Sequence, residues 1–158
     1  MKVLLLTDRM DTGGAETHIA QLARGLSAAD VDVTLLSEGG RLAKRLEEEG
    51  IPQKYLSLFS RNPFRLILAR RQIRRLVQTE GFEILHAHAR VPAFLLRGCE
   101  RWRLPDGRSP VAIVTAHARF EDKRLLSYWG KRTLAVSEDI RLHLCKRYRL
   151  PAESIRVI

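Results

Sequence analysis

The sequence predicts an α/β protein with one doubly wound, mostly parallel sheet of about seven strands and helices on both faces. Short apolar runs alternate with amphipathic helical patterns along the whole chain. The first run, residues 3–6, is entirely apolar, which is typical of a strand covered on both faces. Alternation of this kind places the strands in parallel, joined by right-handed crossovers.

Composition indicates one folded domain with a strong positive charge. The 158 residues are 45% hydrophobic and 29% charged, which separates the chain from disordered proteins and allows a sizeable core. The net charge of +10 favours an anionic partner, namely a nucleic acid, a membrane surface or a phosphorylated ligand. Charge alone does not choose among these three.

The sequence also bears on location. No apolar run reaches the roughly 18 residues of a membrane-spanning helix. Met1-Lys2 leads directly into the first strand, without the long apolar segment of a signal peptide. We therefore expect a cytoplasmic protein in which Cys99 and Cys145 are reduced thiols.

The first half of the chain is expected to form three strands and three helices. Asn62-Pro63 is a strong helix start, because Asn caps free backbone N–H groups and Pro fits the first helical position. Gly39-Gly40 ends the second strand, and Gly50 ends the second helix. The expected strands are residues 2–7, 31–36 and 54–58, and the expected helices are residues 15–28, 41–49 and 62–79.

The second half continues the alternation. Ser137 is expected to cap the last helix, whose first turn carries Glu138 and Asp139, the acids that a helix dipole favours. The expected strands are residues 83–88, 111–115, 133–136 and 154–158. The expected helices are residues 91–103, a short one at 122–128, and one from Ser137 to about Tyr148.

Ligands of such sheets bind beyond the carboxyl ends of the strands, so the residues that follow each strand are the candidates. Gly13-Gly14 follows the first strand and begins a helix. The free N–H groups and the dipole at the start of a helix form an anion-binding site. The loop matches neither the Gly-x-Gly-x-x-Gly fingerprint nor a Walker A loop. A plain turn into the helix is the alternative interpretation.

Histidines follow the fourth and fifth strands. Alternation places His86 and His88 on one face of their strand, and His117 follows the next strand. These side chains could hydrogen-bond a phosphate or a sugar hydroxyl, or simply be satisfied within the sheet. A metal site of His86, His88 and His117 is a further alternative, but no acidic residue completes the set, so we expect no metal.

One helix is strongly basic. Its arginines occur with no acid between them: Arg65, Arg70, Arg71, Arg74 and Arg75. Arg70 and Arg74 are expected to lie away from the apolar face, as are Arg71 and Arg75. Such a helix is either a solvated basic face or a surface for an anionic partner.

The motifs, taken in order, resemble one family. Gly-Gly-x-Glu at 13–16, His-x-His at 86–88, Thr-x-His at 115–117 and Val-Ser-Glu at 136–138 resemble the N-terminal, Rossmann-like domain of retaining family-4 glycosyltransferases with the GT-B fold. Residues 151–158 resemble the run that leads to that family's hinge. The resemblance covers essentially the whole chain, 1–158.

The resemblance implies transfer of a sugar from a nucleotide-sugar donor to an acceptor hydroxyl, without a metal or other cofactor. It assigns Gly13 and Gly14 to the donor diphosphate and His117 to catalysis beside the donor sugar. It assigns four residues to the acceptor: His86, His88, Glu16 and Ser137.

The resemblance also concerns the rest of the protein and its setting. The C-terminal donor-binding domain of the family is absent from these residues, so this chain alone is expected to be inactive. Family members that act on lipid-linked acceptors imply a role in cell-envelope glycan or glycolipid synthesis. They also imply peripheral attachment of the basic helix to the anionic inner face of the membrane.

Two other classes remain open from the sequence. The first is a non-catalytic basic module that binds nucleic acid or an anionic membrane surface. Nucleic acid is not expected, because no helix-turn-helix, RNA-recognition or zinc pattern occurs. The second is a nucleotide-binding hydrolase or epimerase with the same architecture, which fold alone does not exclude.

Overall fold

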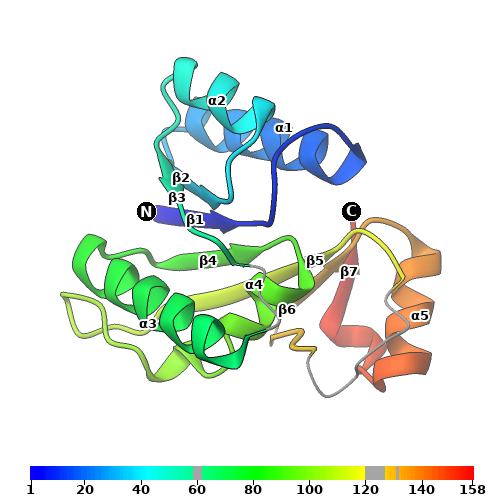
Figure 1. Cartoon of the computed structure of the whole chain (residues 1–158). Coiled ribbons are helices and arrows are strands. Elements are labelled where there is room, and N and C mark those ends of the chain that lie inside the picture. The colour runs from blue at the N-terminus through cyan, green and yellow to red at the C-terminus, as the bar shows by residue number, and fades with distance from the viewer. Residues whose placement is uncertain (59–61, 120–126, 131) are drawn as a thin grey trace.

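The computed structural model describes residues 1–58, 62–119, 127–130 and 132–158. Within them one sheet has the strand order β3-β2-β1-β4-β5-β6-β7, and every neighbouring pair is parallel (Figure 1). The strands are β1 (Lys2–Leu6), β2 (Asp32–Ser37), β3 (Gln53–Tyr55), β4 (Ile84–Ala87), β5 (Val111–Ala116), β6 (Arg132–Ala135) and β7 (Ile155–Val157). The predicted fold class is confirmed.

Helices cover both faces of this sheet. Helices α1 (Gly14–Ala28) and α2 (Arg41–Glu48) lie on one face, and α3 (Pro63–Glu80), α4 (Arg90–Leu95) and α5 (Glu138–Tyr148) lie on the other (Figure 1). Two short 3-10 turns, Cys99–Arg101 and Ala152–Ser154, complete the order. Among the described residues, no helix has both the length and the apolar character needed to cross a membrane.

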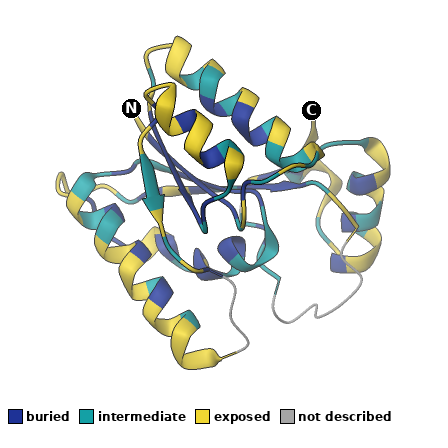
Figure 2. Ribbon diagram, turned by 45° about the horizontal axis from the view of Figure 1, so that its top comes forward, coloured by how far each residue is buried: buried dark blue, intermediate teal, exposed yellow. Residues whose placement is uncertain are grey.

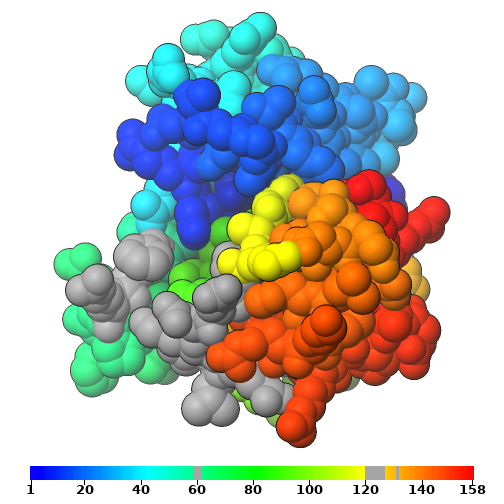
Figure 3. Space-filling model, turned by 90° about the vertical axis from the view of Figure 1, so that its right-hand side faces the viewer, coloured from blue at the N-terminus to red at the C-terminus, as the bar shows by residue number. Residues whose placement is uncertain are grey.

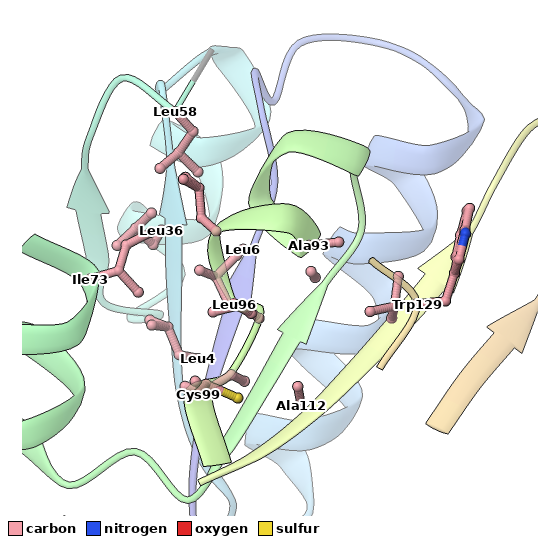
Figure 4. Close-up of a cluster of buried hydrophobic side chains, with 14 of the residues drawn as sticks. Leu4, Leu6, Leu36, Leu58, Ile73, Ala93, Leu96, Cys99, Ala112 and Trp129 are labelled. Atoms are coloured by element: carbon pink, nitrogen blue, oxygen red, sulfur yellow. The ribbon is translucent and has the colours of Figure 1, made fainter. Parts of the chain in front are cut away.

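The core follows from the alternation along the strands. Val3 and Leu5 point into the cluster beneath α1 and α2, whereas Leu4 and Leu6 point into the cluster beneath α3 and α4. Figure 4 shows the second cluster, where Ile73 of α3 lies opposite the leucines of β1 and β2. In Figure 2 the helices turn buried residues toward the sheet and exposed residues outward.

Most of the predicted elements end within one residue of their expected positions. The start of α3 is as predicted, because Asn62 Oδ1 accepts a hydrogen bond of 2.9 Å from the backbone N–H of Phe64. The helix ends at Gly81, whose φ of 77° is left-handed.

Two expected elements are wrong and a third falls on residues that are not described. The helix expected at 91–103 is interrupted: α4 ends at Leu95, and Gly98 takes a left-handed φ of 76° before the turn at Cys99–Arg101. The third strand is Gln53–Tyr55 rather than 54–58, since its pairing with β2 stops at Ser37. Most of the helix expected at 122–128 lies outside the described residues.

The strand order places a switch point between β1 and β4. From β1 the chain winds outward through β2 and β3, and then returns to build β4 on the other side of β1. The carboxyl ends of all seven strands lie at one edge of the sheet, because all pairs are parallel. Ligands of open parallel sheets bind at such a point.

Candidate functional site

The candidate site lies at the carboxyl edge of the sheet, where the segments that follow β1, β4 and β5 meet. Figure 3 looks onto this edge. The blue N-terminal segment lies above the yellow segment that follows β5, and green atoms lie recessed between them. The predicted residues of the opening loop and of both histidine motifs are therefore brought to one edge.

The glycine pair begins α1 as predicted. The carbonyl of Gly13 accepts hydrogen bonds from the backbone N–H and the hydroxyl of Thr17, at 3.0 and 2.8 Å. Gly13 has an extended backbone that any residue can adopt, so its backbone conformation does not require glycine. A β-carbon on Gly13 would collide with the Glu16 carboxylate, whereas nothing lies within 4 Å of one on Gly14. The open backbone at Gly14 is thus the side from which a ligand can approach.

A second glycine pair holds this loop in place. The Met10 N–H donates to the Gly39 carbonyl at 2.8 Å, and the Leu42 N–H donates to the Met10 carbonyl at 2.9 Å. Gly40 has a φ of 127°, and a β-carbon there would strike the Met10 carbonyl. From the sequence, Gly39-Gly40 is predicted only to end a strand, so its part in positioning the opening loop is new.

The histidines converge as predicted, with one addition. The rings of His86 and His88 lie 4.1 Å apart between centroids, which confirms that they share a face of the sheet. His88 Nδ1 lies 3.2 Å from His117 Nε2, so one of the two rings donates to the other. His18 of α1 completes the group, with its ring centroid 5.1 Å from that of His117.

His18 was not predicted from the sequence. It stands on the first turns of α1, and the only signal is its position four residues after Gly14 on a helix that begins at the site. His86 has a different hydrogen-bond partner from the other histidines, since its Nε2 lies 2.7 Å from the Thr115 hydroxyl. This bond orients the His86 ring within the sheet.

Three rings of the cluster, those of His86, His88 and His117, are uncharged at neutral pH. Burial lowers the pKa of His86 to about 4 and that of His117 to about 4. Burial also lowers the pKa of His88 well below its usual range, and the neighbouring histidines act in the same direction. Each of these three rings therefore offers one N–H donor and one lone pair.

A buried carboxyl at the end of β1 was also missed. Asp8 Oδ1 is buried, and no described residue hydrogen-bonds to it. Burial, with a smaller contribution from the Glu38 charge, raises the pKa of Asp8 to about 6, and the Arg90 charge opposes the shift. An unpartnered carboxyl oxygen at this edge is suited to accept a hydrogen bond from a hydroxyl.

Ser137 and Glu16 have local roles in the structure. Ser137 Oγ accepts a hydrogen bond of 3.2 Å from the Ile140 N–H, which confirms the predicted cap of α5. Glu16 lies in the first turn of α1, with its carboxylate against Gly13. A contact of either residue with an acceptor stays a prediction.

The arginines of α3 do not all lie on one face. Four are exposed as expected: Arg65, Arg71, Arg74 and Arg75. The expected position of Arg70 is wrong, because its guanidinium turns toward α4. There it donates to the carbonyls of Leu95 and Arg97, the latter at 2.6 Å, and lies 5.3 Å from the centre of the Trp102 ring.

Comparison with known families shows which family the chain belongs to. The model of the family described as Glycosyltransferase Family 4 matches residues 12–158. The chain belongs to glycosyltransferase family 4. No curated protein matches it.

The family-4 chain superimposes on one part of several larger proteins of known structure. A glycosyltransferase from Rickettsia africae superimposes with a TM-score of 0.80 at 20% identity, over 99% of this chain and 42% of its own. Anabaena HepE, solved in complex with UDP, gives 0.76 at 15% identity, over 100% and 43%. A UDP-GlcNAc 2-epimerase from Neisseria meningitidis gives 0.63 at 12% identity, over 99% and 45%. The chain thus spans less than half the length of these proteins and shares the Rossmann-like half of the GT-B architecture.

Proposed function

We propose that this family-4 chain is the N-terminal, acceptor-side domain of a glycosyltransferase that moves a sugar from a nucleotide-sugar donor to an acceptor hydroxyl. The observation that carries the proposal is that α1, which begins with the open Gly14 backbone and carries His18, meets the neutral ring of His117 at the switch point of the sheet. The epimerase alternative shares the fold, so fold does not separate the two, whereas the family match favours transfer.

In this proposal each group has a distinct task. The N–H groups at the start of α1, with Gly13 and Gly14, receive the donor diphosphate. His117 acts beside the donor sugar, and its neutral ring adds no positive charge where the transition state is itself cationic. Four residues form the acceptor side: His86, His88, Glu16 and Ser137. The C-terminal half that would complete the donor site belongs to the proposal and not to the described structure.

Uridine is the nucleotide we propose for the donor. The support is that Anabaena HepE was solved with UDP and with UDP-glucose. The affinity of this chain for UDP is expected to be weak, because only one wall of the site is present.

A glycine substitution tests the diphosphate site. In Gly14→Ala the added methyl group meets no protein atom within 4 Å but occupies the path of the ligand. We expect UDP affinity, followed by NMR titration, to fall about 10-fold or more. Gly25→Ala is the matched control, since it lies in the same helix and also meets nothing within 4 Å. Equal UDP affinities for the two variants would contradict the proposal.

The second part of the proposal is a lipid-linked acceptor in cell-envelope synthesis, reached from the inner membrane surface. The exposed arginines of α3 lie beside exposed apolar side chains, with Phe64 at 75%, Ile67 at 49% and Leu68 at 54% exposure. A hollow of about 460 Å³ between α3 and α4 is lined mainly by apolar side chains, among them Leu66 and Phe94. Basic and apolar groups together favour the surface of an anionic membrane.

Vesicle sedimentation at low salt tests this part. We expect binding to phosphatidylglycerol vesicles that Arg71→Gln/Arg74→Gln/Arg75→Gln weakens about 10-fold or more. A control variant loses the same charge elsewhere, at the exposed Arg132, Lys146 and Arg156, all changed to Gln. Equal binding to phosphatidylcholine vesicles would exclude an electrostatic membrane contact, and binding to oligonucleotides alone would favour the nucleic-acid module.

A further inference from the structure

Three histidines from three different elements bring their ring nitrogens together at the site. His18 comes from α1, His88 follows β4 and His117 follows β5. One ring nitrogen of each lies within 4.8 Å of the other two. Among the described residues, no other group of three or more His, Cys, Asp and Glu side chains has its potential ligand atoms this close together.

The core of this group is a buried, incompletely satisfied ring. His88 is 4% exposed, and its Nε2 has no hydrogen-bond partner among the described residues. Its Nδ1 faces His117 Nε2 at 3.2 Å. In the absence of an ion these two nitrogens share one proton. Small rotations of the two rings would turn both lone pairs toward one cation.

We propose that His18, His88 and His117 form a binding site for a divalent transition-metal ion, with Zn²⁺ as the best fit. Tetrahedral Zn²⁺ with Zn–N bonds of about 2.0–2.1 Å separates its ligand nitrogens by about 3.4 Å, close to the His88–His117 distance. His18 is half-buried on a helix near its N-terminus, so a change of rotamer can carry its ring the remaining distance, which is at most about 1.4 Å.

The donor set limits the kind of ion. Three imidazoles and no carboxylate suit Zn²⁺, Ni²⁺ or Cu²⁺, whereas Mg²⁺ and Ca²⁺ require oxygen ligands. His86 does not take part, because its Nε2 is engaged by Thr115. Three ligands leave a fourth position open to water or to an oxygen of a ligand.

The proposal goes beyond sugar transfer and does not depend on it. The roles proposed above for Gly14 and His117 need no ion, and a bound ion would occupy the space that a sugar approaches. From the sequence, a metal site of His86, His88 and His117 is only an alternative, and no metal is expected because no acidic residue completes the set. The structure replaces His86 with His18, and this exchange is what brings the three nitrogens together.

Metal titration of the chelator-treated chain tests the site. Calorimetry with Zn²⁺ is expected to give one site with a Kd of about 10 µM or tighter, and Mg²⁺ is expected to give none. Co²⁺ used as a probe is expected to give the intense visible bands of a tetrahedral ion. His18→Gln and His117→Gln should each weaken Zn²⁺ binding about 30-fold or more, because each removes one ligand.

Two further variants serve as controls, and circular dichroism verifies folding. His143→Gln, on α5, and His86→Gln, beside the cluster, should leave Zn²⁺ affinity within about threefold of the parent. Zn²⁺ binding that survives His18→Gln, or no Zn²⁺ binding at all, would overturn the proposal. UDP binding by the metal-free chain is a separate result, so failure of the metal site leaves the proposed transferase role to be judged on its own.

Discussion

At the scale of single residues, Asp8 holds a carboxyl group in a place where ionisation is unfavourable. Burial and the Glu38 charge raise its pKa from 3.8 to about 6, and Arg90 compensates only in part. The folded state therefore holds the Asp8 proton more tightly than the unfolded state. Its contribution to stability is complete below about pH 4 and is lost as the pH rises through about 6.

Asp8→Asn removes this dependence, because the amide resembles the protonated carboxyl and cannot ionise. We expect the variant to gain about 1–2 kcal/mol relative to the parent between about pH 4 and pH 8, after allowance for the partial exposure of the group. Urea unfolding followed by circular dichroism at both pH values measures the gain. Asp106→Asn is the control of opposite sign, since Arg108 lowers the pKa of that exposed carboxyl. A pH-independent difference between Asp8→Asn and the parent would contradict the assignment.

The residues of the site differ in how far the sequence predicts them. His86 lies near the carboxyl end of β4, and His88 and His117 directly follow β4 and β5. These histidines are predictable because all carboxyl ends of a parallel sheet share one edge. His18 is not, because its place depends on how α1 lies across the sheet. Asp8 also follows a strand, but its Oδ1 lacks a hydrogen-bond partner among the described residues because of how the atom is buried, which the local sequence does not predict.

At the scale of elements, the opening loop depends on a contact with the loop after β2. Gly40→Ala would place a β-carbon against the Met10 carbonyl at a left-handed φ of 127°. We expect a loss of about 3 kcal/mol or more in the free energy of unfolding. Gly50→Ala is the control that separates backbone strain from steric collision. Its φ is also positive, at 87°, but no atom of the described residues lies within 4 Å of the added β-carbon. Its expected loss in urea unfolding is about 1 kcal/mol, and similar losses for both variants would argue against the loop contact.

The packing of α3 against α4 depends on Arg70. Arg70→Ala removes two hydrogen bonds to carbonyls and the contact with Trp102. We expect a loss of about 1–2 kcal/mol in thermal or urea unfolding. Arg71→Ala, one position along on the exposed face, is expected to change stability by less than about 0.5 kcal/mol. If the two variants unfolded alike, Arg70 would be a surface arginine like its neighbours.

The interrupted helix and Arg70 have a common physical cause. The sequence from 91 to 103 has helical periodicity, but Gly98 takes a left-handed φ of 76°, and the carbonyls left free around it need donors. Arg70 supplies them for Leu95 and Arg97. The helical spacing of α3 alone predicts that Arg70 lies on the exposed face with Arg74. Arg70 turns toward α4 instead because the helix interrupted at Gly98 leaves carbonyls that accept its hydrogen bonds.

At the scale of the whole molecule, the fold explains why the site is open. The histidines and the opening loop lie at one edge of a single sheet, and the chain spans 42% and 43% of the length of two solved proteins that share its fold. A nucleotide sugar bound here would contact protein on one side, so its reacting carbon would not be held against the acceptor.

The 158-residue chain is therefore expected to show no sugar transfer by itself. Holding two reactants in the right orientation can lower an activation barrier by about 7–11 kcal/mol. A site formed by one domain alone loses most of this contribution. Turnover assays with UDP-glucose and related donors, read by release of UDP, measure the activity, and His117→Gln is the matched control. UDP release above background that His117→Gln abolishes would show that this half is sufficient. Weak UDP binding without turnover would agree with a half-site whose chemistry needs an opposing domain.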